Sequence, residues 1–403
     1  MNQPSHRNHL CIATRSVVRS YHFLRPLMSV GHLLFAGLLV TACSSTAPQI
    51  SSPQHATYVP GLRTDANSGS ALTRWRTEDW QQLPGWSEYQ AQSAWQPFLQ
   101  SCKALGKQPD WQQVCSDASR MNTANASELQ RFFEERFRPW HLTNEDGSTT
   151  GLITGYYEPV LRGSLTRHGP YQTPVYRYPN GVASQQVNKP RAHLMKQPFL
   201  KGKELLWVDD PVDVAYLQVQ GSGRVRLEDG RMIRVGFAGT NNLPFRSFAR
   251  WLLDRHQITA DQATIKGIKQ WAHAHPRQVD DMLNANPRVV FFREMPAVDE
   301  ATGPTGALGV PLTPEHSIAV DPSRVPLGAP VFLSTTRPLS NEPIQKLVIA
   351  QDTGSAIKGT VRADYFWGLG DAAGETAGRM KQRGEMWVLL PRHMGAGQLY
   401  SSR

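Results

Sequence analysis

Two aspartates near the C-terminus have neighbours that suit acid–base chemistry. Asp352 opens the sequence Asp-Thr-Gly-Ser after an apolar run at 347–350, and Asp364 immediately precedes Tyr-Phe-Trp. A carboxyl group beside aromatic surface loses hydration, which favours its neutral form and suits it to donate a proton near neutral pH. Aromatic rings also stack on sugars, so this segment indicates an acid in a carbohydrate site. The alternative is an acid that caps a loop beside core aromatics.

Other motifs fit known chemistries less well. Asp-Thr-Gly is the aspartic-protease signature, but those enzymes need two carboxylates that share a proton, so a chain with one copy would act as a homodimer. Gly221-Ser-Gly223 precedes a predicted hairpin and opens no helix, which argues against a dinucleotide loop. His273 and His275 precede Pro276 at a predicted helix end, where imidazolium suits the helix dipole. The sequence therefore predicts neither a metal nor a cofactor.

Composition is that of a globular protein and limits the partners. The chain has 403 residues, 40% of them hydrophobic and 19% charged, a length typical of two or three domains. The formal net charge is +10, and removing the four arginines of residues 1–42 leaves +6. Because there is no basic run or basic-aromatic stripe, we predict no nucleic-acid binding.

Residues 1–42 are predicted to be a signal peptide. Arginines precede an apolar stretch too short to span a membrane, and Val-Thr-Ala-Cys follows at 40–43. This pattern resembles a bacterial lipoprotein signal, whose cleavage leaves a lipid-carrying Cys43 as the first residue. An ordinary secretory peptide with an incidental cysteine is the alternative. Ser44, in place of an aspartate, resembles the pattern sorted to the outer membrane, so we expect an anchor at its periplasmic face.

Two cysteines remain for the folded part of the chain. Cys11 and Cys43 belong to the targeting segment, which leaves Cys102 and Cys115. An even remainder in an oxidising compartment predicts one disulfide, with two buried thiols as the alternative.

The predicted secondary structure changes along the chain. Residues 43–75 are rich in Ser, Thr, Ala, Pro and Gly and are predicted to be a flexible tether. Helical patterns follow as far as Trp140, including a helix with capping-box spacing from Ser127 whose apolar face carries Leu129 and Phe132. After Gly147, short β-prone runs take over.

The remainder combines strands with two helices. Segments 224–227 and 232–235 alternate on either side of Asp229-Gly230, which predicts a hairpin. Helical periodicity returns over 245–256 and around 265–271. Five more strands are predicted, at 289–292, 317–320, 330–333, 347–350 and 386–390. Short strands broken by Gly and Pro favour a barrel over a doubly wound parallel sheet.

Six motifs, in order, resemble those of the membrane-bound lytic murein transglycosylase A (MltA) family. The resemblance runs from about residue 76 to 393. The motifs are Thr154–Pro159, Leu217–Gly223, Val235–Asn242, Gly306–Thr313, Ile318–Pro322 and Gln351–Gly359.

The resemblance implies a mainly β fold with a helical N-terminal part. In this family a second β-rich domain is inserted in a double-psi β-barrel domain, and a groove lies between them. The changes of texture near 170 and 297 fit such an insertion. We therefore assign 76–170 and 297–394 to the barrel domain and 171–296 to the inserted domain.

The resemblance also implies residue roles. Asp364 would be the catalytic acid, and Asp352 would shape the groove floor and support it. Sugar contacts are expected from Thr154, Tyr157, Gln220, Ser222 and Lys358.

The implied reaction cleaves the β-1,4 bond from N-acetylmuramic acid to N-acetylglucosamine without water. A single aspartate acts as acid and base, and the products end in 1,6-anhydro-muramic acid. Peptidoglycan glycan strands are then the substrate, and proteins of cell-wall synthesis or hydrolysis are the partners to test. Two rivals stay open: a non-catalytic, expansin-like polysaccharide-binding barrel, and a muramidase-type hydrolase.

Overall fold

The computed structural model describes residues 75–121, 125–297, 299 and 301–394. The predicted signal peptide, Cys43 and the tether as far as residue 74 lie outside the described residues. Trp75, where the description begins, is already buried in the core. Within the described ranges, no helix is long and apolar enough to cross a membrane.

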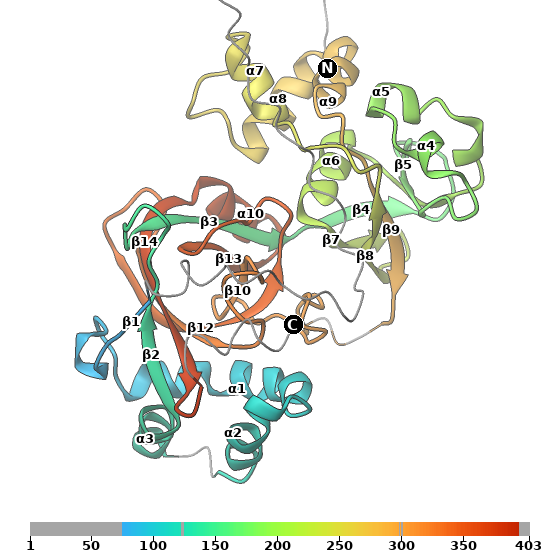
Figure 1. The fold of residues 1–403 in the computed structure, drawn as a ribbon. Coiled ribbons are helices and arrows are strands. Elements are labelled where there is room, and N and C mark those ends of the chain that lie inside the picture. The colour runs from blue at the N-terminus through green and yellow to red at the C-terminus, as the bar shows by residue number, and fades with distance from the viewer. Residues whose placement is uncertain (1–74, 122–124, 298, 300, 395–403) are drawn as a thin grey trace, which may run out of the picture. The chain divides into compact units, whose positions relative to one another are not determined.

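Six strands close into a barrel (Figure 1). Hydrogen-bonded neighbours follow the order β14 (Lys381–Pro391), β11 (Pro330–Thr336), β12 (Pro343–Thr353), β10 (Ser317–Val320), β13 (Arg362–Leu369) and β3 (Gly151–Glu158). Pairing of β3 with β14 completes the ring. The pairs β10–β12 and β13–β3 are parallel. Strands β2 (Phe137–His141) and β1 (Arg76–Thr77) extend the sheet beyond β14.

Burial on both faces explains the apolar run at 347–350. All four residues of this run in β12 have no exposed surface, and helix α1 (Glu88–Leu105) packs against the strand. A strand covered on both faces is expected to be continuously apolar. Gln351 follows the run and is also fully buried; its Nε2 donates to Pro97 O (3.0 Å) and Ser101 Oγ (2.9 Å) of α1. The helical lead-in is thus fastened to the barrel.

The N-terminal part is helical, as predicted, with α1, α2 (Pro109–Ser119) and α3 (Ala126–Arg136), preceded by a 3-10 turn at Trp80–Gln82. The predicted helical stretch to Trp140 is wrong at its end, because Phe137–His141 forms strand β2 and pairs with β14. Trp95 of α1 meets Phe132 and Phe133 of α3 edge to face, with ring centroids 5.0 and 5.7 Å apart. These aromatic side chains are therefore core residues. A disulfide joins Cys102 of α1 to Cys115 of α2.

Helix α3 begins two residues before the predicted start. Asn125, and not Ser127, is its N-cap: Asn125 Oδ1 accepts hydrogen bonds from the backbone N–H groups of Ser127 (3.1 Å) and Glu128 (3.4 Å). Asparagine is as good an N-cap as serine, so the capping-box spacing named the wrong residue.

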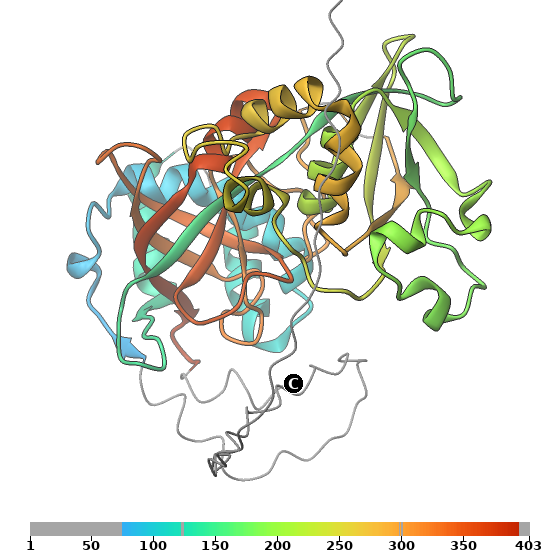
Figure 2. The same cartoon turned by 90° about the horizontal axis from the view of Figure 1, so that it is seen from above.

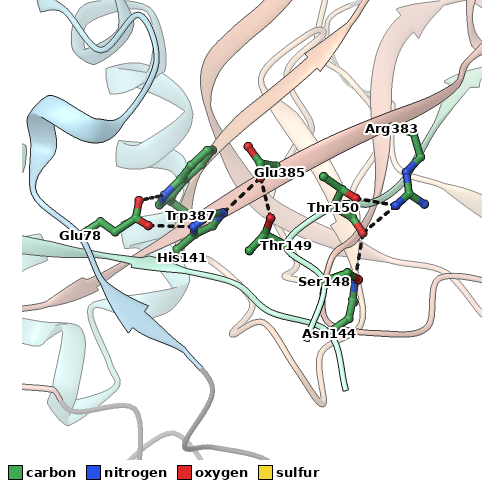
Figure 3. Close-up of polar contacts among 9 residues, drawn as sticks. All are labelled: Glu78, His141, Asn144, Ser148, Thr149, Thr150, Arg383, Glu385 and Trp387. Atoms are coloured by element: carbon green, nitrogen blue, oxygen red, sulfur yellow. Dashed lines mark hydrogen bonds and ion pairs between the residues drawn. The ribbon is translucent and has the colours of Figure 1, made fainter. Parts of the chain in front are cut away.

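A polar cluster fastens the lead-in strands to β14 (Figure 3). Glu78 accepts from Trp387 Nε1 (2.6 Å) and lies 2.9 Å from His141 Nδ1. The His141 ring stacks on Trp387, and Thr149 Oγ1 donates to Glu385 at 2.7 Å. These contacts join residues up to 309 positions apart along the chain.

The second sheet has six strands and its own core. The order is β5 (Thr173–Tyr176), β6 (Glu204–Val208), β4 (Val160–Ser164), β7 (Ser222–Leu227), β8 (Met232–Thr240) and β9 (Val290–Met295). The predicted hairpin is confirmed: β7 and β8 are antiparallel, and Gly230 has φ 84°, which the tight turn needs. The domain boundaries stay a prediction; the first strand of this sheet, β4, already begins at Val160.

The inserted region also contains helices, of which α6 (Pro211–Gln220) packs against the second sheet. The two predicted ones are present as α7 (Phe248–Asp254) and α8 (Ile265–Ala274). The others are α4 (Ser184–Val187), α5 (Arg191–Leu194), α9 (Val279–Asn284) and two 3-10 turns, Pro198–Leu200 and Pro276–Gln278. Figure 2 gives a second view of these elements.

Strand β13, helix α6 and helix α10 (Gly370–Arg379) lack a clear sequence signal. β13 carries Asp364, yet its glycine and charged flanks resemble a loop. α6 is apolar on several sides, so its period is weak. With these additions the predicted fold class, a barrel with a second β-rich part inserted, is confirmed.

A buried ion cluster fastens the two chain segments that link the sheets. Glu158 at the end of β3 is 1% exposed, and its Oε2 accepts from Arg224 Nε at 3.0 Å. Arg234 Nη2 lies 3.8 Å from the other oxygen. Arg224 also donates to Thr302 O (2.6 Å), and Arg234 to Gly303 O (2.7 Å), on the returning segment. One carboxylate and two arginines thus hold both chain segments that link the two sheets.

Candidate active site

The register of two parallel strands brings Asp364 to Thr154. In the β13–β3 pairing these residues face each other, and Thr154 Oγ1 donates to Asp364 Oδ1 at 2.5 Å. Burial raises the pKa of Asp364 to about 6, and the nearby Asp352 charge adds to the rise. The Thr154 hydrogen bond and the Arg362 guanidinium act in the opposite direction. Asp364 therefore holds a proton at mildly acidic pH.

Asp352 lies one strand away, with both carboxylate oxygens bonded. Ala319 of β10 pairs with Asp352 on one side and Asp364 on the other. Asp352 Oδ1 accepts from Ala307 N–H at 2.9 Å, and Oδ2 accepts from Tyr156 OH at 3.2 Å. Burial raises the pKa of Asp352, while these hydrogen bonds and that of Thr353 N–H oppose the rise.

Both aspartates line one cavity of about 240 Å³. The barrel contributes β3, β10, β12 and β13 to its walls, together with the loop at 354–357. The second sheet and its connections contribute Gln218, Val219, Gln220, Phe245, Asn286, Arg288 and Val290. Acid and base groups thus come from the barrel, and most of the side chains opposite come from the inserted region.

Four of the predicted site residues meet at this cavity. Thr154, Asp352 and Asp364 come from the barrel and Gln220 from the C-terminal end of α6. Gln220 Oε1 accepts from Tyr157 N–H at 3.2 Å, which holds the end of α6 against β3.

Three predicted sugar contacts lie elsewhere. Tyr157 points to the opposite face of β3 from Thr154, because side chains alternate along a strand, and lines a separate cavity of about 620 Å³ with α8 and α10. Ser222 lines a smaller cavity beside Glu158. The Lys358 side chain is 65% exposed, with Nζ 3.8 Å from Asp321.

Tyr156, Phe245 and Arg288 line the cavity, although sequence reasoning did not select them. Tyr156 stands two residues after Thr154, so strand alternation could have found it. Burial and the two aspartates raise its pKa, which keeps the hydroxyl protonated as a donor. Phe245 and Arg288 lie in loops of the inserted region. The helix predicted from residue 245 begins only at Phe248, so Phe245 stands before it and lines the cavity.

The histidines near Pro276 behave as predicted for a helix end. His273 is in the last turn of α8, and His275 is its C-cap, with Nδ1 2.9 Å from Trp271 O and its ring stacked on Trp271. Over the part of the chain that the structure describes, no three His, Cys, Asp or Glu side chains gather as metal ligands would.

Comparison with known proteins gives two family matches. Residues 152–293 match the MltA specific insert domain, and residues 316–390 match the 3D domain. Membrane-bound lytic murein transglycosylase A of Escherichia coli (strain K12) is 30% identical over 271 residues, which is 65% of this chain and 71% of that protein. The protein of the same name from Vibrio cholerae is 30% identical over 295 residues, covering 66% and 77% respectively.

Solved lytic transglycosylases share this fold of a barrel with an inserted sheet. The lytic transglycosylase LtgG of Burkholderia pseudomallei is 53% identical, with a TM-score of 0.61 over 84% of this chain and 100% of that one. MltA from Neisseria gonorrhoeae is 33% identical, with a TM-score of 0.71 over 80% and 93%. E. coli MltA with bound chitohexaose is 25% identical, with a TM-score of 0.63 over 74% and 90%. The chain belongs to the membrane-bound lytic murein transglycosylase A family.

Proposed function

We propose that this chain cleaves the β-1,4 bond from N-acetylmuramic acid to N-acetylglucosamine in peptidoglycan without using water. The observation that carries the proposal is the Asp364 carboxyl, which lines the cavity, is fixed by Thr154 and has a pKa raised to about 6. A carboxyl group with such a pKa can protonate a leaving oxygen near neutral pH. The names of the relatives support murein as the substrate.

One carboxyl group can serve both halves of this reaction. Asp364 first protonates the glycosidic oxygen, and the bond from that oxygen to C1 of the muramic residue breaks. The 2-acetamido group supports the oxocarbenium-like C1. The Asp364 carboxylate then takes the proton of the 6-hydroxyl as O6 bonds to C1. The products are a 1,6-anhydro ring and a free 4-hydroxyl, and Asp364 is protonated again.

Asp352 is assigned a positioning role. Hydrolytic glycosidases use two carboxyl groups, so a second one in the same cavity makes a muramidase-type hydrolase the specific rival. Both Asp352 oxygens already accept hydrogen bonds, from Ala307 and Tyr156, which suits a fixed charge better than a mobile base. An intramolecular 6-hydroxyl gains by proximity what a second carboxylate would otherwise supply.

Mass spectrometry of muropeptides tests the reaction. The purified full chain in detergent is incubated with peptidoglycan, and the released products are weighed. Products one water lighter than hydrolytic ones, with no reducing muramic end, are expected. Reducing ends would establish the hydrolase instead, and glycan binding without products would establish a wall-binding barrel.

We also propose that lipid on Cys43 anchors the enzyme at the periplasmic face of the outer membrane. The lipoprotein-like signal and the serine after Cys43 support this location, and the relatives are named membrane-bound. A tether of about thirty residues would let the active site reach glycan strands away from the membrane.

A further inference from the structure

Arg288 is a cation in the active-site cavity with few protein partners. It is half-buried, and burial lowers its pKa. Its Nη1 donates to Leu243 O at 3.2 Å, which uses one of the five N–H donors of a guanidinium. Within the described ranges of the chain, no carboxylate forms an ion pair with it. A guanidinium removed from water in this way has donors left for an acceptor on a ligand.

The backbone that carries Arg288 is held from both sides. Asn286 Oδ1 accepts from the N–H groups of Arg246 (3.1 Å) and Arg288 (3.2 Å). The buried Arg191 donates to Arg288 O at 3.0 Å and to Asn286 O at 3.3 Å, and it also bonds Gln218 of the cavity wall. These bonds fix the backbone around Arg288 before a ligand binds, which lowers the entropic cost of binding.

Arg288 does not act as the counter-ion of the two aspartates. The pKa of Asp364 responds to Arg362 and Asp352, and that of Asp352 responds to burial and hydrogen bonds. Among the described residues, Arg288 forms no ion pair with either aspartate, although it lines the same cavity. Its remaining donors are therefore available to a part of the substrate other than the reacting oxygen.

We propose that Arg288 binds the lactyl group on the muramic residue of the substrate. This assignment rests on the proposed function. Muramic acid differs from glucosamine by this 3-O-lactyl ether, whose carboxyl carbon carries the stem peptide or a free carboxylate. A planar guanidinium matches the two oxygens of a carboxylate or the carbonyl of an amide. Phe245, 45% exposed in the same cavity, offers a ring for an adjoining sugar.

Arg288 thereby becomes a specificity-determining residue. A glycan of N-acetylglucosamine alone lacks the lactyl group and leaves the guanidinium unpaired. The enzyme should then prefer muramic-containing strands over chitin-like ones, and the preference should depend on Arg288.

Binding to two glycans tests this role. One is peptidoglycan strands stripped of stem peptides by an amidase, which carry free lactyl carboxylates. The other is chitohexaose, which has none. The full chain with Asp364→Asn, which prevents turnover, is compared with the same chain carrying Arg288→Gln, Arg288→Lys or Arg293→Gln. Arg293 is exposed and outside the cavity lining, so it is the matched control.

Arg288→Gln is expected to weaken binding of stripped strands about 10- to 100-fold, as for loss of a hydrogen-bonded charge. Chitohexaose binding should change less than about twofold by the same reasoning, with Arg288→Lys in between and Arg293→Gln unchanged. Equal weakening for both glycans, or none for stripped strands, overturns the assignment.

The result is separable from the proposed reaction. Selective weakening together with hydrolytic products, or none, would keep Arg288 as the lactyl-binding residue while the transglycosylase proposal fails. Anhydro products from the chain without these substitutions, together with no selective weakening, would keep the reaction and reject the role of Arg288.

Discussion

Among individual residues, Asp364 combines two properties that normally conflict. Its carboxyl group is largely desolvated, which disfavours its charge, and yet the residue is only half-buried and lines a cavity. Its pKa of about 6 is the consequence. An acid with this pKa carries its proton below about pH 6 and can release it to a glycosidic oxygen.

Asp364→Asn should abolish turnover, keep glycan binding and stabilise the fold at neutral pH. A carboxyl group with a raised folded pKa binds its proton more tightly in the native state. The contribution of Asp364 to stability is therefore fully present below its ordinary pKa of 3.8 and is lost as pH rises from there through about 6. Asparagine removes this loss, a gain of at most about 3 kcal/mol for two pKa units. Thermal unfolding at pH 4 and 7.5 measures the change in stability, and product release measures turnover. Near-wild-type activity would reject Asp364 as the acid.

The rate of the unmodified enzyme should follow the protonated form of Asp364. kcat/KM is expected to decline above pH 6, because the acid must carry its proton.

Asp352→Asn should slow the reaction without abolishing it. The Asp352 charge raises the pKa of Asp364, so its removal lowers that pKa and shifts the decline of kcat/KM to lower pH. A shift of one pKa unit would cost roughly tenfold at neutral pH. The pH–rate profile separates this from simple misfolding. An inactive Asp352→Asn beside an active Asp364→Asn would mean that the two roles are reversed.

Strand β3 is the element on which the site depends most. It pairs with β13 and β14, carries Thr154 and Tyr156 toward the cavity, and packs against α10. Residue 155 must be glycine for β3 to lie this close to α10 and to the Trp367 ring. A Cβ at this position would lie 2.7 Å from the Trp367 ring and 2.9 Å from Ala377 Cα.

Gly155→Ala should therefore destabilise the protein by about 1–3 kcal/mol through overpacking, and should lower activity by shifting Thr154. Gly378→Ala is the control: it lies exposed on α10, where an added Cβ meets nothing within 4 Å, so it should be neutral or slightly stabilising. Urea unfolding of both variants gives the comparison. Equal stability of the two would show that β3 and α10 can separate without cost.

For the whole chain, the Glu158 cluster decides how firmly the segments between the sheets are held. Glu158→Gln leaves Arg224 and Arg234 without their carboxylate in a buried site, and breaking a buried pair this way costs about 3–5 kcal/mol. Glu294→Gln makes the same change at an exposed position of the same sheet and should have little effect. Calorimetry of both variants measures the difference; a loss no larger than that of Glu294→Gln would leave the cluster no stabilising role.

The anchor is a property of the complete protein. Cys43→Ser should move the enzyme from the membrane fraction to the soluble one, because lipidation needs the thiol. Activity per molecule on isolated peptidoglycan should stay unchanged. Continued cofractionation of the variant with membranes would argue against a lipid anchor at Cys43.

The amino-acid sequence by itself determined the features that depend on local order. The six motifs indicated the family, alternation around Asp229-Gly230 predicted the hairpin, and aromatic neighbours marked Asp364. Each of these signals lies within a few residues, where periodicity and residue type are sufficient. Strand β13 escaped prediction, because glycine and charge flank its apolar centre.

Only the tertiary structure decided which side chains share the cavity. Thr154 and Tyr157 stand in one motif, but the face of β3 separates them into different cavities. Arg288 and Phe245 come from other parts of the chain and line the same cavity as Asp364, and no local pattern indicates this. Strand register and helix packing set these neighbours. Both depend on contacts between residues far apart in the sequence, which local patterns do not specify.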